Sequence, residues 1–323
     1  MAEESSQRQV KKKLTILEQI AYIKNLGIKF DDFSEEQAKD FLSNHTYFFK
    51  VKAYAKCFAK YINPAHPKWG KYVRLDFNQL VELSRIDMAF RDTILHITLD
   101  IEHLLRVDLN TKISDSPDDD GYKETEAFLK NNPVIKTRIN NVLNSSSSNH
   151  YIFDMTRKYK DSFAVWNLME ILSFGELIRL YDFYKSRLGL NEKVCSLLRY
   201  VKFARNAAAH SNCMLNQLSS EPKPNPSKTL KTLYSQKIKK ISPSVTKNLA
   251  IPAIHDFTAC IFVFQLIVKN HNAYDRATES LKKLKTVITP KRELFVNELN
   301  ITSGLDFICE IIDYFCQKSL LFS

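Results

Sequence analysis

The amino-acid sequence predicts an all-α protein: a helical bundle with a helical segment before it and further helices after it. Apolar residues recur at helical spacing over long stretches, whereas no strand pattern of useful length occurs. Only 6 of the 323 residues are glycine, so no long glycine-rich loop can form. Phosphate-binding turns depend on glycine, and neither the dinucleotide-binding motif nor the P-loop motif occurs, which argues against both nucleotide-binding folds.

The first segment, residues 1–70, is expected to hold two or three helices between residues 14 and 62. Ser34, followed by Gln37, is typical of a helix start. Residues 45–61 are rich in aromatics and lysine, and they are either a packed amphipathic helix or a stacking surface for RNA bases. Burial is favoured because helical apolar periodicity mostly marks a buried face. The aromatic residues near that face are Tyr47, Phe48, Tyr54 and Phe58.

The second segment, residues 71–218, is the expected helical core. Its longest periodic helix pattern covers residues 77–113, and a loop of proline, acids and glycine ends that pattern at residues 114–121. A run of four serines flanked by asparagines predicts a second loop at residues 144–149.

Two further helix patterns complete this core. One covers residues 162–188 and is interrupted by Gly175, and the other covers residues 191–210. Asn191 is the expected N-cap of the second pattern, because an asparagine side chain accepts from the free N–H groups of a first turn.

The third segment, residues 219–249, contains four prolines and seven lysines, which is typical of an exposed connector or a short Lys-rich helix. Lys237, Lys239 and Lys240 are candidate RNA contacts, although a solvated face is an equal alternative. Helices are expected again in the last segment, residues 250–323. We also take Lys50 and Lys52, in the aromatic stretch, as candidate RNA contacts.

Charge and cysteine content restrict the partners. The formal net charge is +11 and the sequence pI is about 9.2, which favours a polyanion such as nucleic acid. The six cysteines form no C-x-x-C pair, so we expect free thiols, no metal site and no cofactor. No apolar signal region and no run of 18 apolar residues occurs, and we therefore expect a cytoplasmic protein without a membrane partner.

Residues 205–210 (RNAAAH) carry the groups with useful chemistry. A histidine can donate or accept a proton near neutral pH, and an arginine can stabilise a charged phosphate. RNA supplies its own nucleophile, the 2′-OH, so Arg205 and His210 suffice for cleavage without a metal. On a helix these two side chains diverge by about 140°. Two copies across a symmetric dimer would place both pairs around one phosphate, and we therefore expect a homodimer.

The same spacing occurs a second time, from Arg91 to His96. His96 lies in the apolar rhythm of its helix, between Ile94 and Ile97. The later string differs, because an amide follows its arginine and three alanines precede its histidine. This context favours residues 205–210 as the functional string.

An arginine, a polar residue and a histidine at this spacing, late in a helical domain, resemble the signature of the HEPN ribonucleases. Those helical domains dimerise to assemble a metal-independent ribonuclease site, so the resemblance implies a HEPN-like core here. It implies that Arg205 stabilises the phosphate and that His210 acts as acid or base. Asn206 would orient the phosphate or the histidine. Glu102 and Arg106, which match an upstream motif of such domains, would position Arg205, unless they form an ordinary surface ion pair.

Residues 165–181 (VWNLMEILSFGELIRLY) are similar to a segment of the Abi-2 family of bacterial abortive-infection proteins, and the resemblance extends over roughly residues 14–290. Family members often carry Cys-Ala-His-His where this chain has Ala-Ala-His-Ser, which leaves His210 as the one histidine there. The resemblance implies phage defence by growth arrest or cell death, and kinship with the Cas13 effectors. The implied partners are a small noncoding RNA and a target RNA.

Two other functions are compatible with the sequence. The first is a non-catalytic RNA-binding scaffold for a structured noncoding RNA. The second is a helical interaction protein without a nucleic-acid role, in which Arg205 and His210 merely complement the negative end of a helix dipole. Dependence of RNA cleavage on Arg205 and His210 separates the endoribonuclease from both.

Overall fold

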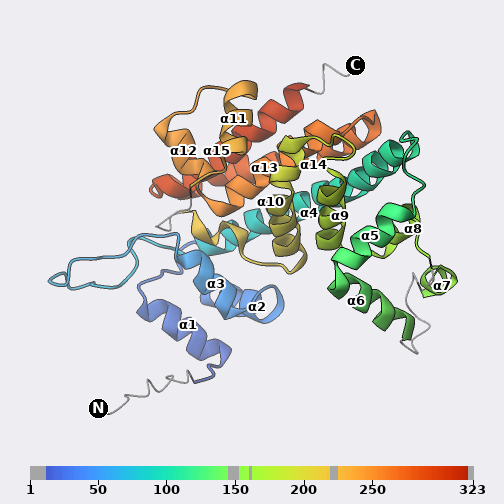
Figure 1. Ribbon diagram of the computed structural model, residues 1–323. Helices are drawn as coiled ribbons and strands as arrows, with labels where there is room; N and C mark the ends of the chain where they lie inside the picture. The colour runs from blue at the N-terminus through green and yellow to red at the C-terminus, as the bar shows by residue number, and fades with distance from the viewer. Residues whose placement is uncertain (1–11, 145–152, 160–161, 219–224, 319–323) are drawn as a thin grey trace, which may run out of the picture.

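A computed structural model describes residues 12–144, 153–159, 162–218 and 225–318 (Figure 1). This part of the chain forms fifteen α-helices and two short 3-10 helices, and its only β pairings are two isolated bridges, which join Lys29 to Asp76 and Lys60 to Tyr72. The prediction of an all-α fold is confirmed. Apart from Asn144, the serine-rich loop expected at residues 144–149 lies outside the described residues.

Three helices form the N-terminal segment, and the predicted start at Ser34 is confirmed. The Ser34 hydroxyl accepts from the Gln37 N–H at 3.2 Å, and the Gln37 side chain accepts from the Ser34 N–H at 2.8 Å. Of the aromatic stretch, Tyr54 and Phe58 are buried as predicted, whereas Tyr47 precedes the third helix and is 57% exposed. The helices are α1 (Ile16–Asn25), α2 (Glu35–Asn44) and α3 (Phe48–Ala55).

The longest helix, α4 (Phe77–Ser114), crosses the body of the molecule, and the pattern predicted over residues 77–113 is confirmed (Figure 1). Its N-cap is Asp76, whose carboxylate accepts from the Asn78 N–H at 2.8 Å. Isoleucine, leucine and phenylalanine side chains along its length are fully buried. Helices from both ends of the chain pack on α4, which therefore forms the axis of the core.

Five helices follow α4, and one prediction about them is wrong. The pattern over residues 162–188 is broken at Ser173 and not at Gly175. Ser173 adopts an extended backbone and caps a new helix together with Glu176, which satisfies the free N–H groups of its first turn. Gly175 lies inside that helix, where an added Cβ would lie 3.3 Å from Cδ of Lys202. The helices are α5 (Lys123–Asn131), α6 (Pro133–Asn144), α7 (Phe153–Lys158), α8 (Val165–Ile171) and α9 (Phe174–Tyr184).

The helix predicted over residues 191–210 is α10 (Glu192–Ala209), and Asn191 is its N-cap as predicted. A short 3-10 helix, η1 (Met214–Gln217), follows it. The remaining elements are α11 (Lys228–Lys237), α12 (Pro243–Leu249), α13 (Pro252–Ile267), α14 (His271–Ile288), η2 (Thr289–Phe295) and α15 (Leu299–Lys318).

The buried apolar side chains form one continuous cluster that runs from Ile20 to Phe315. Helix α13 is buried on nearly all sides and packs against both α4 and α10. Hydrophobic contacts therefore cross the segment boundaries proposed after residues 70 and 249, and the division into four segments stays a prediction.

Two further findings concern the described residues as a set. No single helix there is both long and apolar enough to cross a membrane, although α12 and α13, bent by 92°, pass that test as a pair. None of the six cysteines, all of which are described, forms a disulfide, and no group of three or more potential ligands is placed to hold a metal ion in the described part of the chain.

Candidate active site

The predicted site residues lie where α10 runs antiparallel along α4. Arg205 contacts Glu102, and the chain just after α10 contacts α4 nearer its start, through Arg91 and Asp87. This pairing brings the end of α10, with His210, to the half of α4 that also packs on α3.

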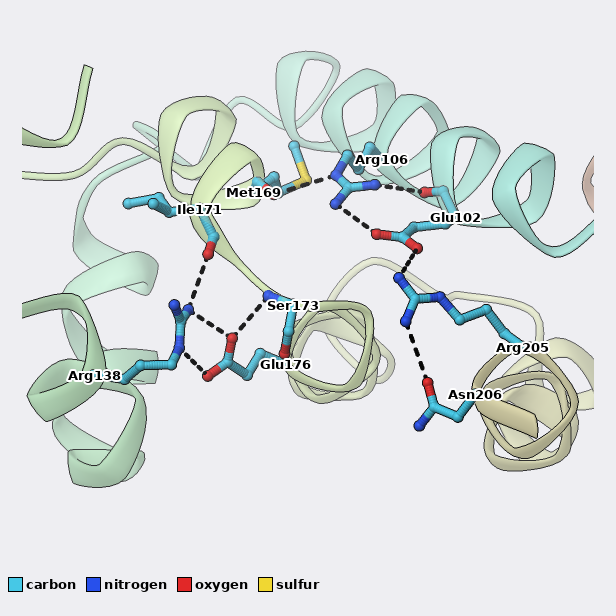
Figure 2. Close-up of polar contacts among 9 residues, drawn as sticks. All are labelled: Glu102, Arg106, Arg138, Met169, Ile171, Ser173, Glu176, Arg205 and Asn206. Atoms are coloured by element: carbon cyan, nitrogen blue, oxygen red, sulfur yellow. Dashed lines mark hydrogen bonds and ion pairs between the residues drawn. The ribbon is translucent and has the colours of Figure 1, made fainter. Parts of the chain in front are cut away.

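Glu102, which is buried, and Arg106, whose side chain is 20% exposed, form an ion pair on α4, as Figure 2 shows. Arg106 donates to Oε1 of Glu102 at 2.9 Å, to the Glu102 carbonyl at 3.3 Å and to the Met169 carbonyl at 3.2 Å. The Glu-x-x-x-Arg motif is therefore a fixed internal pair that also joins α4 to α8, and it is not an ordinary surface ion pair.

Arg205 extends from α10 toward this pair and is held more loosely (Figure 2). One terminal nitrogen lies 3.8 Å from Oε2 of Glu102, and the other donates to Oδ1 of Asn206 at 3.3 Å. Its Nε is buried without a hydrogen-bond partner, and the side chain is 31% exposed. Since a guanidinium carries five N–H donors, Arg205 keeps unused capacity for an anion.

His210 ends α10 in a tight turn. The Ser211 N–H donates to the Ala208 carbonyl at 3.0 Å, and the Asn212 N–H donates to the Ala207 carbonyl at 2.9 Å, which is the Schellman pattern. Ser211 has a φ of +53°, in the left-handed region that favours glycine. This turn leaves the His210 side chain exposed at the end of the helix.

A buried carboxylate fixes the chain that follows His210. Asp87 on α4 forms an ion pair with Arg91 and accepts from the Tyr54 hydroxyl at 2.6 Å and from the Leu215 N–H at 2.8 Å. Arg91 also donates to the Asn212 carbonyl at 3.3 Å. Asp87 thereby ties the turn that carries His210 to α3 and α4.

Burial raises the pKa values of two groups in this cluster, the Asp87 carboxyl and the Tyr54 phenol. Burial raises the pKa of the Asp87 carboxyl, and the adjacent Arg91 opposes that rise. Burial, together with the neighbouring Asp87 charge, raises the pKa of the Tyr54 phenol. The Tyr54 hydroxyl therefore keeps its proton and donates a hydrogen bond to Asp87 across the physiological pH range.

His210 opens onto a pocket of about 420 Å³ between α3, η1 and α13. Lys50, one of the predicted RNA contacts, lines the same pocket beside the exposed rings of Tyr47 and Phe49. Arg205 lies outside it, on the side of α10 that faces α4. The structure thus brings Lys50 together with His210 but does not bring Arg205 and His210 of one chain to a common point.

Sequence reasoning missed Asp256, which lines this pocket from α13. Its Oδ1 lies 3.0 Å from Nδ1 of His255, and Nε2 of His255 accepts from the Ser227 N–H at 3.2 Å. The proton of His255 is therefore on Nδ1, and the ring donates to Asp256. Burial raises the pKa of Asp256, and the hydrogen bond from His255 opposes that rise. An acid 46 residues beyond His210 carries no local signal of this proximity.

The other predicted RNA contacts lie apart from the pocket. Lys52 covers the rings of Tyr22 and Phe48, at 4.8 and 5.5 Å from their centres. Lys239 pairs with Glu310, and Lys237 and Lys240 are exposed on and after α11. None of these four lysines lines the pocket.

A second arginine pair supports the helix arrangement beside the site (Figure 2). Arg138 on α6 donates to both oxygens of Glu176 at 2.7 Å and to the Ile171 carbonyl at 2.9 Å. Burial raises the pKa of Glu176, but hydrogen bonds from Arg138 and Ser173 outweigh it and hold that pKa below its usual range. The pair of Arg138 and Glu176 therefore stabilises the chain where α8 ends and α9 begins.

Trp166, near the start of α8, packs against the loop that follows α4. Its indole lies against Gly121, where an added Cβ would lie only 2.5 Å from the ring, and Gly121 has a φ of +77°. The Val165 N–H donates to the Gly121 carbonyl at 2.8 Å. The conformation at Gly121 therefore fits glycine for two separate reasons, a left-handed backbone and a close aromatic neighbour.

Residues 40–216 match the model of a known family, described as Abi-like protein, over more than half of the chain. The matched segment contains Glu102, Arg106, Arg205 and His210, and it ends before α13, which supplies Asp256. No curated protein and no solved structure matches the chain. The chain belongs to the Abi-like family of abortive-infection proteins.

Proposed function

We propose that this protein acts in phage defence as a metal-independent endoribonuclease of the HEPN type, with Arg205 and His210 from two subunits forming one site. The observation that carries the proposal is the contrast between Arg205 and its neighbour Arg106. Arg106 has three hydrogen bonds, whereas Arg205 keeps a buried, unpartnered Nε and reaches the same glutamate only at 3.8 Å. An arginine held in place with spare donors suits a transient phosphate charge.

The proposed chemistry uses the 2′-OH of the RNA as the nucleophile. His210 of one subunit accepts the 2′-OH proton while the 2′-oxygen attacks phosphorus, and the partner's His210 donates a proton to the departing 5′-oxygen. The products are a 2′,3′-cyclic phosphate and a free 5′-OH. Arg205 stabilises the extra negative charge on the pentacoordinate phosphorus, and Glu102 positions Arg205 through its Oε2 atom.

The exposed face of α10 supports a symmetric dimer. Arg199, Phe203, Asn206 and His210 follow one another at helical spacing and form a single stripe, in which Asn206 is half-buried and the other three are exposed. Phe203 is 53% exposed in the middle of that stripe, which an apolar contact with a second copy would cover. Packing two such stripes about a two-fold axis would bring both His210 side chains to one place, with Arg205 at the flank.

Charge supports RNA as the substrate and as the partner. The net charge is +11, and Lys50 lines the His210 pocket together with the exposed rings of Tyr47 and Phe49. A cation beside aromatic faces is typical of surfaces that bind single-stranded RNA. We propose that a small noncoding RNA and a target RNA are both bound in this way.

The test is RNA cleavage by the purified full-length chain in EDTA. His210→Ala should slow cleavage by about 10²- to 10⁴-fold, which is the usual contribution of a general acid or base. His96→Ala is the matched control, because His96 belongs to the second string with the same spacing, and it should retain cleavage.

Three results would contradict the proposal: equal cleavage by His210→Ala, cleavage only with magnesium, or an equal loss in His96→Ala. Tight RNA binding by the wild type with no cleavage under any condition would favour the non-catalytic scaffold. Absence of RNA binding at low salt would contradict both functions, because binding driven by phosphate contacts is strongest there.

A further inference from the structure

A basic stretch of the chain lines the His210 pocket at its start, through Tyr47, Phe49 and Lys50, and extends well beyond that pocket. Residues 41–75 contain seven lysines and arginines and no aspartate or glutamate, in a chain that carries 36 acids. This stretch begins in the last turn of α2, includes α3 and ends in the connection from α3 to α4. We call residues 59–74 of that connection the basic arm.

The basic arm has a defined backbone conformation. The Tyr61 N–H donates to the Lys71 carbonyl, the Gly70 N–H donates to the Tyr61 carbonyl, and the Val73 N–H donates to the Ala59 carbonyl, each at 2.9 Å. Figure 1 shows the arm, in light blue between α3 and α4, projecting away from the body of helices. The arm is therefore a loop fixed by backbone hydrogen bonds, and most of its side chains are exposed, although that of Tyr72 is buried.

A pocket of about 550 Å³ lies between the arm and the chain that joins α1 to α2. Two acids line it, and each is already paired with a lysine that also lines it. Asp31 pairs with Lys29 at 2.8 Å, and Glu35 pairs with Lys24 at 2.8 Å.

Three further cations of the arm line the same pocket, namely Lys68, Lys71 and Arg74. All three are exposed, and none forms an ion pair with another described residue. Because the two acids are neutralised by their own lysines, these three positive charges give the pocket a net attraction for anions.

Arg74 is held at this pocket by a strained backbone. Its φ is +54°, a conformation that costs an L-residue about 1 kcal/mol or more. Pairing on both sides keeps it there, since the Tyr72 N–H donates to the Leu26 carbonyl at 2.8 Å and the Lys29 N–H donates to the Leu75 carbonyl at 2.8 Å. Strain that its surroundings enforce is common where a side chain must be positioned for a ligand.

Aromatic side chains lie beside these cations. Tyr61 lines the pocket and stacks on His66 with ring centres 4.3 Å apart. Trp69, between Lys68 and Lys71 in sequence, is 61% exposed. An exposed aromatic ring on a basic arm, such as that of Trp69, suits an unpaired nucleobase, which an acidic peptide does not offer.

We propose that the basic arm and its pocket form a second RNA-binding site, separate from the Arg205–His210 site. Lys68, Lys71 and Arg74 bind backbone phosphates there, and Trp69 stacks on an unpaired base. This inference rests on the proposed RNA-binding function and not on cleavage.

The experiment measures binding of a labelled single-stranded RNA oligonucleotide to the full-length His210→Ala protein over a series of salt concentrations. The triple substitution Lys68→Ala, Lys71→Ala and Arg74→Ala should weaken binding. It should also reduce the slope of log K against log salt by about 2, because each phosphate contact contributes roughly 0.7 to that slope. Trp69→Ala should weaken binding roughly tenfold at every salt concentration without changing the slope.

The matched control is the triple substitution Lys123→Ala, Lys130→Ala and Lys136→Ala. It removes the same charge from exposed lysines on α5 and α6, on the other side of the molecule from the arm (Figure 1). The control should leave the slope almost unchanged. Helical circular dichroism of each variant checks that the fold is intact.

An unchanged slope in the arm variant, an equal change in the control, or displacement of the RNA by polyglutamate as readily as by a competing RNA would overturn the inference. The two proposals fail separately. If the arm variant binds like its parent, while His210-dependent cleavage occurs in the wild type, only the second site is lost. If the wild type binds no RNA at low salt, the proposed function itself fails.

Discussion

The chain contains an arginine and a histidine at the same spacing in two places, and the two places differ in what surrounds the arginine. Arg91 and His96 lie within α4, and Arg205 and His210 lie at the end of α10. Spacing alone does not distinguish the two strings. They differ in the carboxylates that each arginine contacts in the folded protein.

Arg91 is committed to the fold. It pairs with Asp87, which is fully buried, and it donates to the Asn212 carbonyl at 3.3 Å. The nearest carboxylate to Arg205, that of Glu102, is already bound by Arg106 at 2.9 Å. The contacts of Arg91 therefore stabilise the fold, whereas Arg205 keeps unpaired N–H donors that a ligand can use.

The histidines differ in their access to a pocket and not in their pairing. Nε2 of His96 is buried, 3.9 Å from the Asp100 carboxylate on the same helix. His210 caps a helix and lines a pocket with Lys50 and Asp256. A short motif becomes chemically useful only where its arginine keeps unpaired donors and its histidine opens onto a pocket, and the predictions below test that difference.

The largest expected effect concerns Asp87. Asp87→Ala should lower the free energy of unfolding by about 3–5 kcal/mol, because removing one partner leaves Arg91 as a poorly compensated charge. Urea denaturation followed by circular dichroism measures the loss. Asp100→Ala, which removes a carboxylate from the same helix, is the control and should lose far less. A loss below about 1 kcal/mol for Asp87→Ala is what an exposed ion pair contributes, and it would contradict the claim that Arg91 mainly stabilises the fold.

The next effect concerns Arg205. Arg205→Ala should reduce RNA cleavage by about 10²- to 10³-fold, the usual effect of losing one donor to a charged transition state. Its unfolding free energy should fall by no more than about 1 kcal/mol, since Glu102 stays paired with Arg106 and the Arg205 side chain is 31% exposed. Rates with saturating RNA, measured beside the urea midpoint, check both parts. An unstable Arg205→Ala protein with a normal cleavage rate would reverse the assignment.

A smaller effect concerns Glu176, the partner of a well-satisfied arginine. Because its folded-state pKa lies below the ordinary value of 4.5, ionised Glu176 stabilises the fold above that pH. The stabilisation should be lost as pH falls below 4.5 through the folded pKa. Stability curves of the wild type and Glu176→Gln should therefore converge in acid. Curves that stay parallel down to the acid limit would contradict the pairing with Arg138.

The smallest effect concerns the turn after His210. Ser211→Gly should raise the unfolding free energy by about 1 kcal/mol, because glycine adopts a positive φ without a steric penalty. Thermal denaturation measures the gain, and Ser211→Val should shift the midpoint in the opposite direction. Equal midpoints for all three proteins would show that the turn is not strained.

Much of the fold follows from local sequence. The long apolar periodicity of α4, the capping pair at Ser34 and Gln37, and the N-cap Asn191 all depend on neighbours within a few residues. The break at Ser173 was missed because a serine cap and a nearby glycine compete as signals, and the glycine serves close helix packing instead.

The site is predicted less completely, because its contacts join distant parts of the chain. Residue type and spacing identify Arg205 and His210. They do not show that Glu102 is shared with Arg106, or that α13 places Asp256 beside His210. The run without acids before residue 76 is visible in the sequence. Only the fold shows that the two nearby acids are paired with other lysines, so that no acid neutralises Lys68, Lys71 and Arg74.

The most direct test of a site shared by two subunits is the activity of a mixed dimer. Wild-type and His210→Ala chains with different tags are co-expressed, and the dimer that carries both tags is isolated and assayed for RNA cleavage in EDTA. A shared site needs both histidines, so the mixed dimer should be as inactive as the dimer with two substituted chains. Cleavage at about half the wild-type rate, as expected for two independent subunits, or isolation of the protein only as a monomer that cleaves RNA, would contradict the account.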